Sequence, residues 1–192
     1  MLSSPKSNEG RVVFMGNSIT EGWGNLRPEF FAGKPYVNRG ISGETTPQML
    51  TRFKQDVVRL EPAAVVILAG INDIAGNTGP TTIEAITENI VSMVELANKN
   101  DIKVVLCAVL PANKFPWRPE VIPTEKVVQL NALLKNYAES NAIPYVDYYT
   151  PMVDDAGGLP LALAADGVHP NVTGYLIMEP LLERALKKVL SR

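Results

Sequence analysis

The sequence predicts an α/β protein built on a mostly parallel five-stranded sheet with helices on both faces. Short apolar runs rich in β-branched residues alternate along the chain with segments whose apolar residues recur at helical spacing. The run 64–69 is apolar throughout and the run 103–110 nearly so, as in strands that are covered on both faces. This alternation favours parallel strands joined by right-handed crossovers.

Five segments are expected to be strands, because each is short and rich in apolar, β-branched or aromatic residues. In chain order they are 11–15, 36–38, 64–69, 103–110 and 144–148. Four helices are expected between or after them, each with one apolar face. The residues of these faces are Leu50, Phe53, Val57 and Leu60; Ile83, Ile86, Ile90, Val94 and Ala97; Val127, Leu130, Leu134 and Tyr137; and Met178, Leu181, Ala185 and Val189.

Capping signals mark where three of these helices begin. Thr46 followed by Pro47 predicts an N-cap with proline at the first helical position. Thr81 with Glu84 three residues later predicts a capping box. Asn171 predicts the N-cap of the last helix.

Length and composition limit the classes of protein. The 192 residues fit a single domain, 11–192, after a polar N-terminal tail, 1–10. The net charge of −2 gives no footprint for nucleic acid or an anionic membrane surface, and no run approaches the roughly 20 apolar residues of a membrane span. The tail has no apolar signal core, so the protein is cytoplasmic, or periplasmic or secreted if a signal peptide was removed. The oligomeric state, monomer or small homo-oligomer, stays open.

Single cysteine and histidine residues restrict the chemistry further. Cys107 alone allows no intrachain disulfide, and it lies in a predicted buried strand as a core residue. His169 alone excludes a multi-histidine metal site, and any histidine base must be this residue. We expect neither a metal nor a cofactor.

Polar residues and glycines follow every predicted strand. They occupy 16–20, 39–43, 70–73, 111–123 and, after the last strand and a further loop, 166–170. Because the carboxyl ends of parallel strands meet at one edge of a sheet, these segments are expected to form one site.

Three of these residues are suited to nucleophilic catalysis. Ser18 lies where the first strand turns towards a helix, and its hydroxyl needs a base because a free alcohol is a weak nucleophile. His169 can be that base, and Asp166, three residues earlier, can orient the imidazole and stabilise the imidazolium. The backbone N–H groups of Ser18 and Gly40 and the side-chain amide of Asn72 are candidate donors to an oxyanion.

In order along the chain, these blocks resemble a known family. Residues 16–20, Gly40, 70–73 and 166–170 look like the ordered blocks of the SGNH hydrolases, also called GDSL-like lipases and esterases. The resemblance implies a flavodoxin-like three-layer α/β/α sandwich without cofactor. It also implies a Ser18–His169–Asp166 triad, with Gly40 and Asn72 completing the oxyanion hole. Asn17 departs from the family pattern, which usually has Asp at that position.

The substrate expected from this resemblance is a short-chain, chiefly acetyl, ester of a carbohydrate or a similar small molecule. Six residues beside the blocks are assigned to substrate binding: Asn17, Trp23, Ile71, Asp73, Trp117 and Val168. For Trp117, stacking on a sugar or lining an acyl pocket and ordinary loop packing remain equally open.

Several alternatives remain. A lysophospholipase, thioesterase or platelet-activating-factor-acetylhydrolase-like enzyme would use the same triad. Ser42 is a competing nucleophile, although Gly-x-Ser-x-Gly occurs nowhere. From a different class, a flavodoxin-like module could bind a flavin phosphate or another ligand without catalysis.

Overall fold

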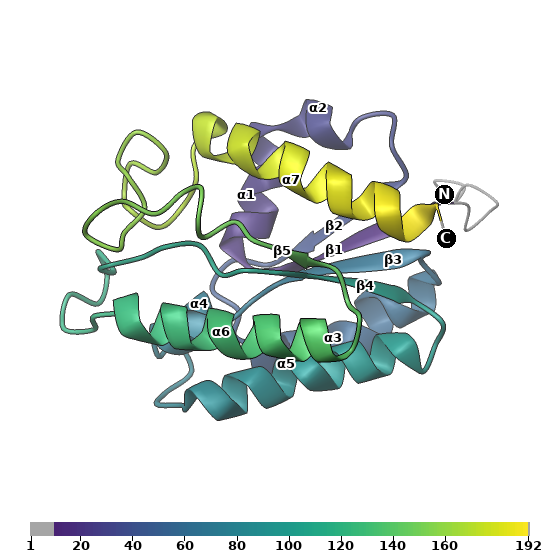
Figure 1. Ribbon diagram of the computed structural model, residues 1–192, viewed down its shortest axis with the longest axis horizontal. Helices are drawn as coiled ribbons and strands as arrows, with labels where there is room; N and C mark the ends of the chain where they lie inside the picture. The colour runs from purple at the N-terminus through teal and green to yellow at the C-terminus, as the bar shows by residue number, and fades with distance from the viewer. Residues whose placement is uncertain (1–9, 192) are drawn as a thin grey trace.

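The computed structural model describes residues 10–191, so all of the expected tail except Gly10 lies outside the described residues. Five parallel strands form one sheet in the order β2-β1-β3-β4-β5 (Figure 1). The strands are β1 (Val12–Gly16), β2 (Tyr36–Gly40), β3 (Ala64–Leu68), β4 (Lys103–Cys107) and β5 (Tyr145–Val146). The sheet confirms the prediction of five parallel strands, and all five predicted segments match to within three residues at each end.

Helices cover both faces of this sheet. Figure 1 shows α1, α2 and α7 over one face and α3, α5 and α6 over the other, which makes the three layers. In chain order the helices are α1 (Ser18–Leu26), α2 (Pro28–Phe31), α3 (Thr46–Asp56), the 3-10 turn η1 (Val58–Leu60), α4 (Ile71–Ile74), α5 (Ile83–Asn98), α6 (Thr124–Ser140) and α7 (Val172–Leu190). Within residues 10–191, none of these helices combines the length and apolar character needed to cross a bilayer.

The core lies on both sides of the central strands. Every residue of β1 and β3 is buried, as expected for apolar runs covered by helices on both faces. The predicted apolar helix faces supply the other half of the core, with Phe53, Ile86, Leu130 and Met178 no more than 1% exposed. The last predicted strand, 144–148, shortens to two residues, because only Tyr145 and Val146 pair with β4.

Two helix starts differ from the prediction by one residue. The N-cap of α3 is Thr45, whose N–H donates to the side chain of Gln48 at 3.0 Å. The N-cap of α5 is Thr82, whose hydroxyl accepts from the amide of Ala85 at 3.2 Å, so the predicted capping box at residue 81 was wrong. A threonine doublet lies at the start of each helix: its first residue caps α3 and its second caps α5. Asn171 caps α7 as predicted.

Candidate active site

The serine that follows β1 lies at the first position of α1. Asn17 is the N-cap, and its side-chain oxygen accepts from the amide of Ile19 at 3.0 Å. Asn17 is 1% exposed, so it fixes the turn that carries Ser18 and presents no side chain to a substrate. The Ser18 Oγ lies 2.9 Å from His169 Nε2.

The histidine is held from its other side by a carboxylate. His169 Nδ1 lies 2.6 Å from Asp166 Oδ2, which assigns the proton to Nδ1 and leaves Nε2 as an acceptor for the serine hydroxyl. Asp166 Oδ1 accepts from the amides of Val168 and His169 at 2.9 and 2.8 Å. Partial burial raises the pKa of Asp166, but the hydrogen bonds from the imidazole and the two amides outweigh it and hold the pKa below its usual value. The carboxylate is therefore ionised at neutral pH.

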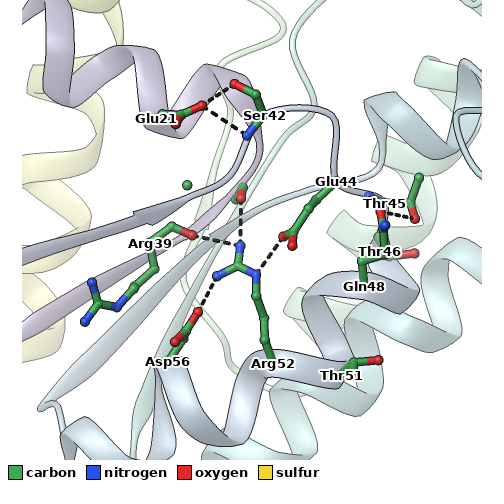
Figure 2. A network of polar contacts seen from close by, with 12 residues as sticks. Glu21, Arg39, Ser42, Glu44, Thr45, Thr46, Gln48, Thr51, Arg52 and Asp56 are labelled. Carbon is green, nitrogen blue, oxygen red and sulfur yellow. Dashed lines mark hydrogen bonds and ion pairs between the residues drawn. The ribbon is translucent and has the colours of Figure 1, made fainter.

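The competing nucleophile is engaged elsewhere. Ser42 lies on the exposed loop after β2, and both its hydroxyl and its amide donate to the carboxylate of Glu21 (Figure 2). The hydroxyl of Ser18, by contrast, is the one that contacts the imidazole. Of the two serines, Ser18 has the base.

One predicted oxyanion donor is already occupied. The amide of Gly40 donates to the side-chain oxygen of Asn38 at 2.8 Å. A Cβ at position 40 would lie 2.2 Å from the amide nitrogen of Glu21 and 2.8 Å from the carbonyl of Asn17. Gly40 therefore allows β2 to pack closely against the first turn of α1, and its predicted role as a free donor is corrected.

The other side-chain donor is oriented by the backbone. Asn72 lies in the short helix α4 after β3 and is 4% exposed. One N–H of its amide donates to the carbonyl of Glu44 at 2.9 Å, and the other has no partner among residues 10–191. The Ser18 amide, at the start of α1, likewise has no acceptor within the described chain.

Sequence reasoning missed Gly43, the residue before the Glu44 carbonyl that accepts from Asn72. Its φ is +80°, which suits glycine, and nothing lies within 4 Å of a Cβ built on it. Its carbonyl accepts from the side-chain amide of Asn77 at 3.1 Å, whereas its own N–H donates to no residue in the described part of the chain. Because Glu44 is the next residue and holds Asn72, Gly43 presents an open N–H near that amide. The sequence signal was a glycine three residues beyond the strand.

Trp23 belongs to the core, which corrects its predicted place in substrate binding. The side chain is 2% exposed and stacks between Phe30 and Tyr175, at centroid distances of 5.0 and 5.4 Å. Its Nε1 donates to Glu179 at 3.3 Å.

Three further predicted contacts are also buried. Ile71 and Val168 are 4% and 2% exposed and belong to the apolar core. Asp73 is 5% exposed, and its carboxylate accepts from the amide and hydroxyl of Thr46. Burial raises the pKa of Asp73 although the bonds from Thr46 oppose it. The core holds two of these side chains and Thr46 engages the third, so their predicted contacts with substrate are corrected too.

Trp117 does lie beside the histidine. Its side chain is 43% exposed, and its ring centroid is 5.9 Å from that of His169. The buried ring of Phe115 lies 5.2 Å away and supports it. An aromatic surface therefore borders the open side of the site, where Asp166 and His169 are each 39% exposed.

Two other kinds of reactive group were considered from the sequence, a cluster of metal ligands and the single cysteine thiol. In residues 10–191, no group of three or more His, Cys, Asp or Glu side chains is placed to hold a metal ion. Burial raises the pKa of the Cys107 thiol to about 12, as expected for a core residue. What the site offers is a serine hydroxyl, an imidazole, a carboxylate and N–H groups without acceptors in the described part of the chain.

Comparison with known proteins agrees with this chemistry. The profile of the "GDSL-like Lipase/Acylhydrolase family" matches residues 14–177. The crystal structure of a GDSL-like lipase from Bacteroides thetaiotaomicron is 50% identical, with a TM-score of 0.94 over 97% of this chain and 92% of that one. Acetylxylan esterases of Xylanibacter ruminicola and Geobacillus stearothermophilus are 23% and 27% identical over 97% and 88% of this chain. The chain spans 45% of the length of the Xylanibacter protein and 90% of the Geobacillus one. The chain therefore belongs to the GDSL-like lipase/acylhydrolase family, the carboxylic ester hydrolases of the SGNH superfamily.

Proposed function

We propose that this esterase hydrolyses short acyl esters, chiefly acetyl esters carried by a carbohydrate, through an acyl-enzyme on Ser18. The observation that carries the proposal is the unbroken series of contacts from Ser18 Oγ to His169 Nε2 at 2.9 Å and from His169 Nδ1 to Asp166 Oδ2 at 2.6 Å. Nucleophile and base within hydrogen-bond reach, with the base oriented by a third group, define this kind of catalysis.

In the first half of the reaction, Ser18 Oγ attacks the ester carbonyl carbon while His169 Nε2 takes the hydroxyl proton. Asp166 stabilises the imidazolium that forms. The tetrahedral intermediate collapses, the C–O bond to the alcohol breaks, and His169 returns the proton to the leaving oxygen. Water then attacks the acyl-enzyme by the same steps in reverse and releases the acid and Ser18.

The oxyanion is stabilised by the N–H groups that lack partners. These are the amide of Ser18, the second N–H of the Asn72 side chain and the amide of Gly43, which replaces Gly40 in this role. One such donor contributes about 10²–10³ in rate, because it is oriented before charge develops. Ser18 also lies at the positive end of the α1 dipole.

The preference for a carbohydrate acetyl ester is supported by Trp117 and by the relatives. An exposed indole beside the base offers an apolar face on which a sugar ring can stack while its acetyl group reaches Ser18. Two of the relatives are acetylxylan esterases. The alternative of a long acyl chain requires an extended apolar acyl site, and a chain-length series separates the two.

The test is hydrolysis of p-nitrophenyl acetate, butyrate and octanoate by wild type, Ser18→Ala and Ser42→Ala. We expect Ser18→Ala to lose at least about 10³-fold in kcat, and Ser42→Ala to stay within about threefold of wild type. The acetate should give the highest kcat/KM, and acetylated xylo-oligosaccharides should release acetate. Equal rates for wild type and Ser18→Ala would refute the nucleophile. A preference for octanoate would instead support the lysophospholipase or thioesterase alternative.

A further inference from the structure

Arg52 joins three segments that lead into the active site. It lies in α3, and its side chain is 14% exposed. Its Nη2 donates to the carbonyls of Gly16 at 3.2 Å and Arg39 at 2.8 Å, and its Nε donates to Glu44 at 2.6 Å. Figure 2 shows the guanidinium between the end of β2, Glu44 and Asp56, the last of which it contacts through Nη1 at 2.8 Å.

Two of these segments lead to a proposed oxyanion donor, and the third orients another. Gly16 is the last residue of β1, two residues before Ser18. Arg39 leads through the end of β2 into the loop that holds Gly43. The carbonyl of Glu44 orients the amide of Asn72. The guanidinium therefore contacts the strand ends that lead to Ser18 and Gly43 and the residue that orients Asn72, although it has no contact with the hydroxyl of Ser18 or with His169.

A single planar group is suited to this task. A guanidinium has five N–H donors in a fixed fork, and here four bonds to protein oxygens use that geometry. The charges also match, because the carboxylates of Glu44 and Asp56 flank it and are themselves 15% and 23% exposed. Lysine would keep the charge but could not reach two carbonyls and two carboxylates from one fixed plane.

We propose that Arg52 is a positioning residue that sets the geometry of the oxyanion hole by pinning the carboxyl ends of β1 and β2 and the Glu44 turn. This inference rests on the proposed function and assigns a role to a residue outside the triad. Donors stabilise an oxyanion when they lie 2.7–3.1 Å from it, and displacement by about 1 Å can cost about 10²-fold in rate. Loss of Arg52 should therefore weaken the transition state more than the ground state.

The chain offers a matched control in Arg27. It also forms a largely buried ion pair through two of its nitrogens, with Nε 2.8 Å from Glu179 Oε1 and Nη2 3.0 Å from Glu179 Oε2. Its side chain is 17% exposed, close to that of Arg52. It lies beyond the last residue of α1, at the opposite end of that helix from Ser18. Arg27→Lys thus removes comparable bonds without touching the segments that carry the donors.

The experiment compares Arg52→Lys and Arg27→Lys with wild type on p-nitrophenyl acetate, with kcat corrected for the folded fraction. For Arg52→Lys we expect kcat to fall about 10–100-fold with KM changed by less than about threefold. For Arg27→Lys both constants should stay within about threefold. The inhibition constant of phenylboronic acid, which forms a tetrahedral adduct with a nucleophilic serine, should rise for Arg52→Lys by the factor that kcat loses.

The outcomes separate this inference from the proposed function. Wild-type protein without Ser18-dependent hydrolysis would overturn both. Hydrolysis that depends on Ser18 but is unchanged in Arg52→Lys, or that falls while boronate inhibition stays constant, would overturn the role of Arg52 alone. If Arg52→Lys fails to fold, Glu44→Gln is the deciding variant, because it leaves the arginine and all backbone contacts in place. A kcat about 3–10-fold lower than that of wild type supports the role of Arg52, and an unchanged kcat rejects it.

Discussion

The contact between Asp166 and His169 predicts a specific defect in Asp166→Asn. The Oδ1 atom accepts from two backbone amides, and Oδ2 accepts from the imidazole. An asparagine that keeps its oxygen towards the two amides must turn its NH₂ group towards Nδ1. The imidazole then has to place its proton on Nε2, where it faces the Ser18 hydroxyl and cannot act as a base. The loop keeps its backbone bonds, and catalysis loses its general base.

We therefore expect kcat of Asp166→Asn to fall by about 10⁴-fold, equivalent to about 5 kcal/mol of transition-state stabilisation, in a variant that stays folded at neutral pH. The assay is p-nitrophenyl acetate hydrolysis at saturating substrate. Asp154→Asn is the matched control, since Asp154 Oδ1 also accepts from two amides, those of Ala156 and Gly158. Its kcat should equal that of wild type. A folded Asp166→Asn variant with kcat within tenfold of wild type would show that the imidazole needs no carboxylate partner.

Four further outcomes follow from the structure. Gly70 has a φ of +117°, and a Cβ there would lie 2.5 Å from Leu130, so Gly70→Ala should lower the unfolding free energy in urea by about 2–4 kcal/mol. Asn17→Ala loses the cap of α1 and should cost about 1 kcal/mol in the same assay, whereas Asn17→Asp should retain the cap. Trp117→Ala should reduce kcat/KM for acetylated xylo-oligosaccharides by about 3–10-fold and leave p-nitrophenyl acetate nearly unaffected. Because folding lowers the pKa of Asp166, its ionised form stabilises the fold above about pH 3.9 and that contribution is lost as the pH falls through the lower folded value. The stability gap between wild type and Asp166→Asn should thus shrink between pH 6 and pH 3.

The fold could be predicted because strands that are buried on both faces consist almost entirely of apolar residues, and this pattern is visible in the sequence. Runs such as 64–69 have no polar side to place in water, so only a central strand accommodates them. Short elements produce no such pattern. The four-residue helix α4 and the two-residue strand β5 are set by contacts with neighbouring segments, and periodicity cannot define an element that spans only about one period.

The triad contacts were predicted because Ser18 directly follows β1 at the start of α1, and because Asp166 lies three residues before His169, close enough for its carboxylate to reach the imidazole. The substrate contacts were not predicted correctly, because closeness in sequence does not determine which way a side chain faces. Trp23 lies five residues after Ser18 in α1, which rotates it by about 140° around the helix axis. That rotation turns the indole into the core, although the serine at the helix start faces the site. The helical period could have shown this.

The two glycines after β2 show a different limit. Gly40 and Gly43 are both small and both near the site, and the sequence does not say which amide is free. The deciding fact is the Asn38 side chain, which accepts from Gly40 and so removes it as a donor. Whether Asn38 can accept from the amide of Gly40 depends on the rotamer of Asn38. That rotamer is selected by a second hydrogen bond, in which the side-chain amide of Asn38 donates to the carbonyl of Thr20 at 2.6 Å.

The neutral cap at Asn17 bears on the same oxyanion. Asn17 is buried directly before Ser18, at the positive end of the α1 dipole. An aspartate would satisfy the amide of Ile19 equally well, but its charge would offset the dipole that favours negative charge on the oxyanion. Asparagine keeps the cap and leaves the dipole uncompensated. Since a charge near a helix end contributes about 0.3–1 kcal/mol, Asn17→Asp should lower kcat about two- to fivefold without lowering stability. An increase in kcat would show instead that the carboxylate helps to orient the serine turn more than it opposes the oxyanion.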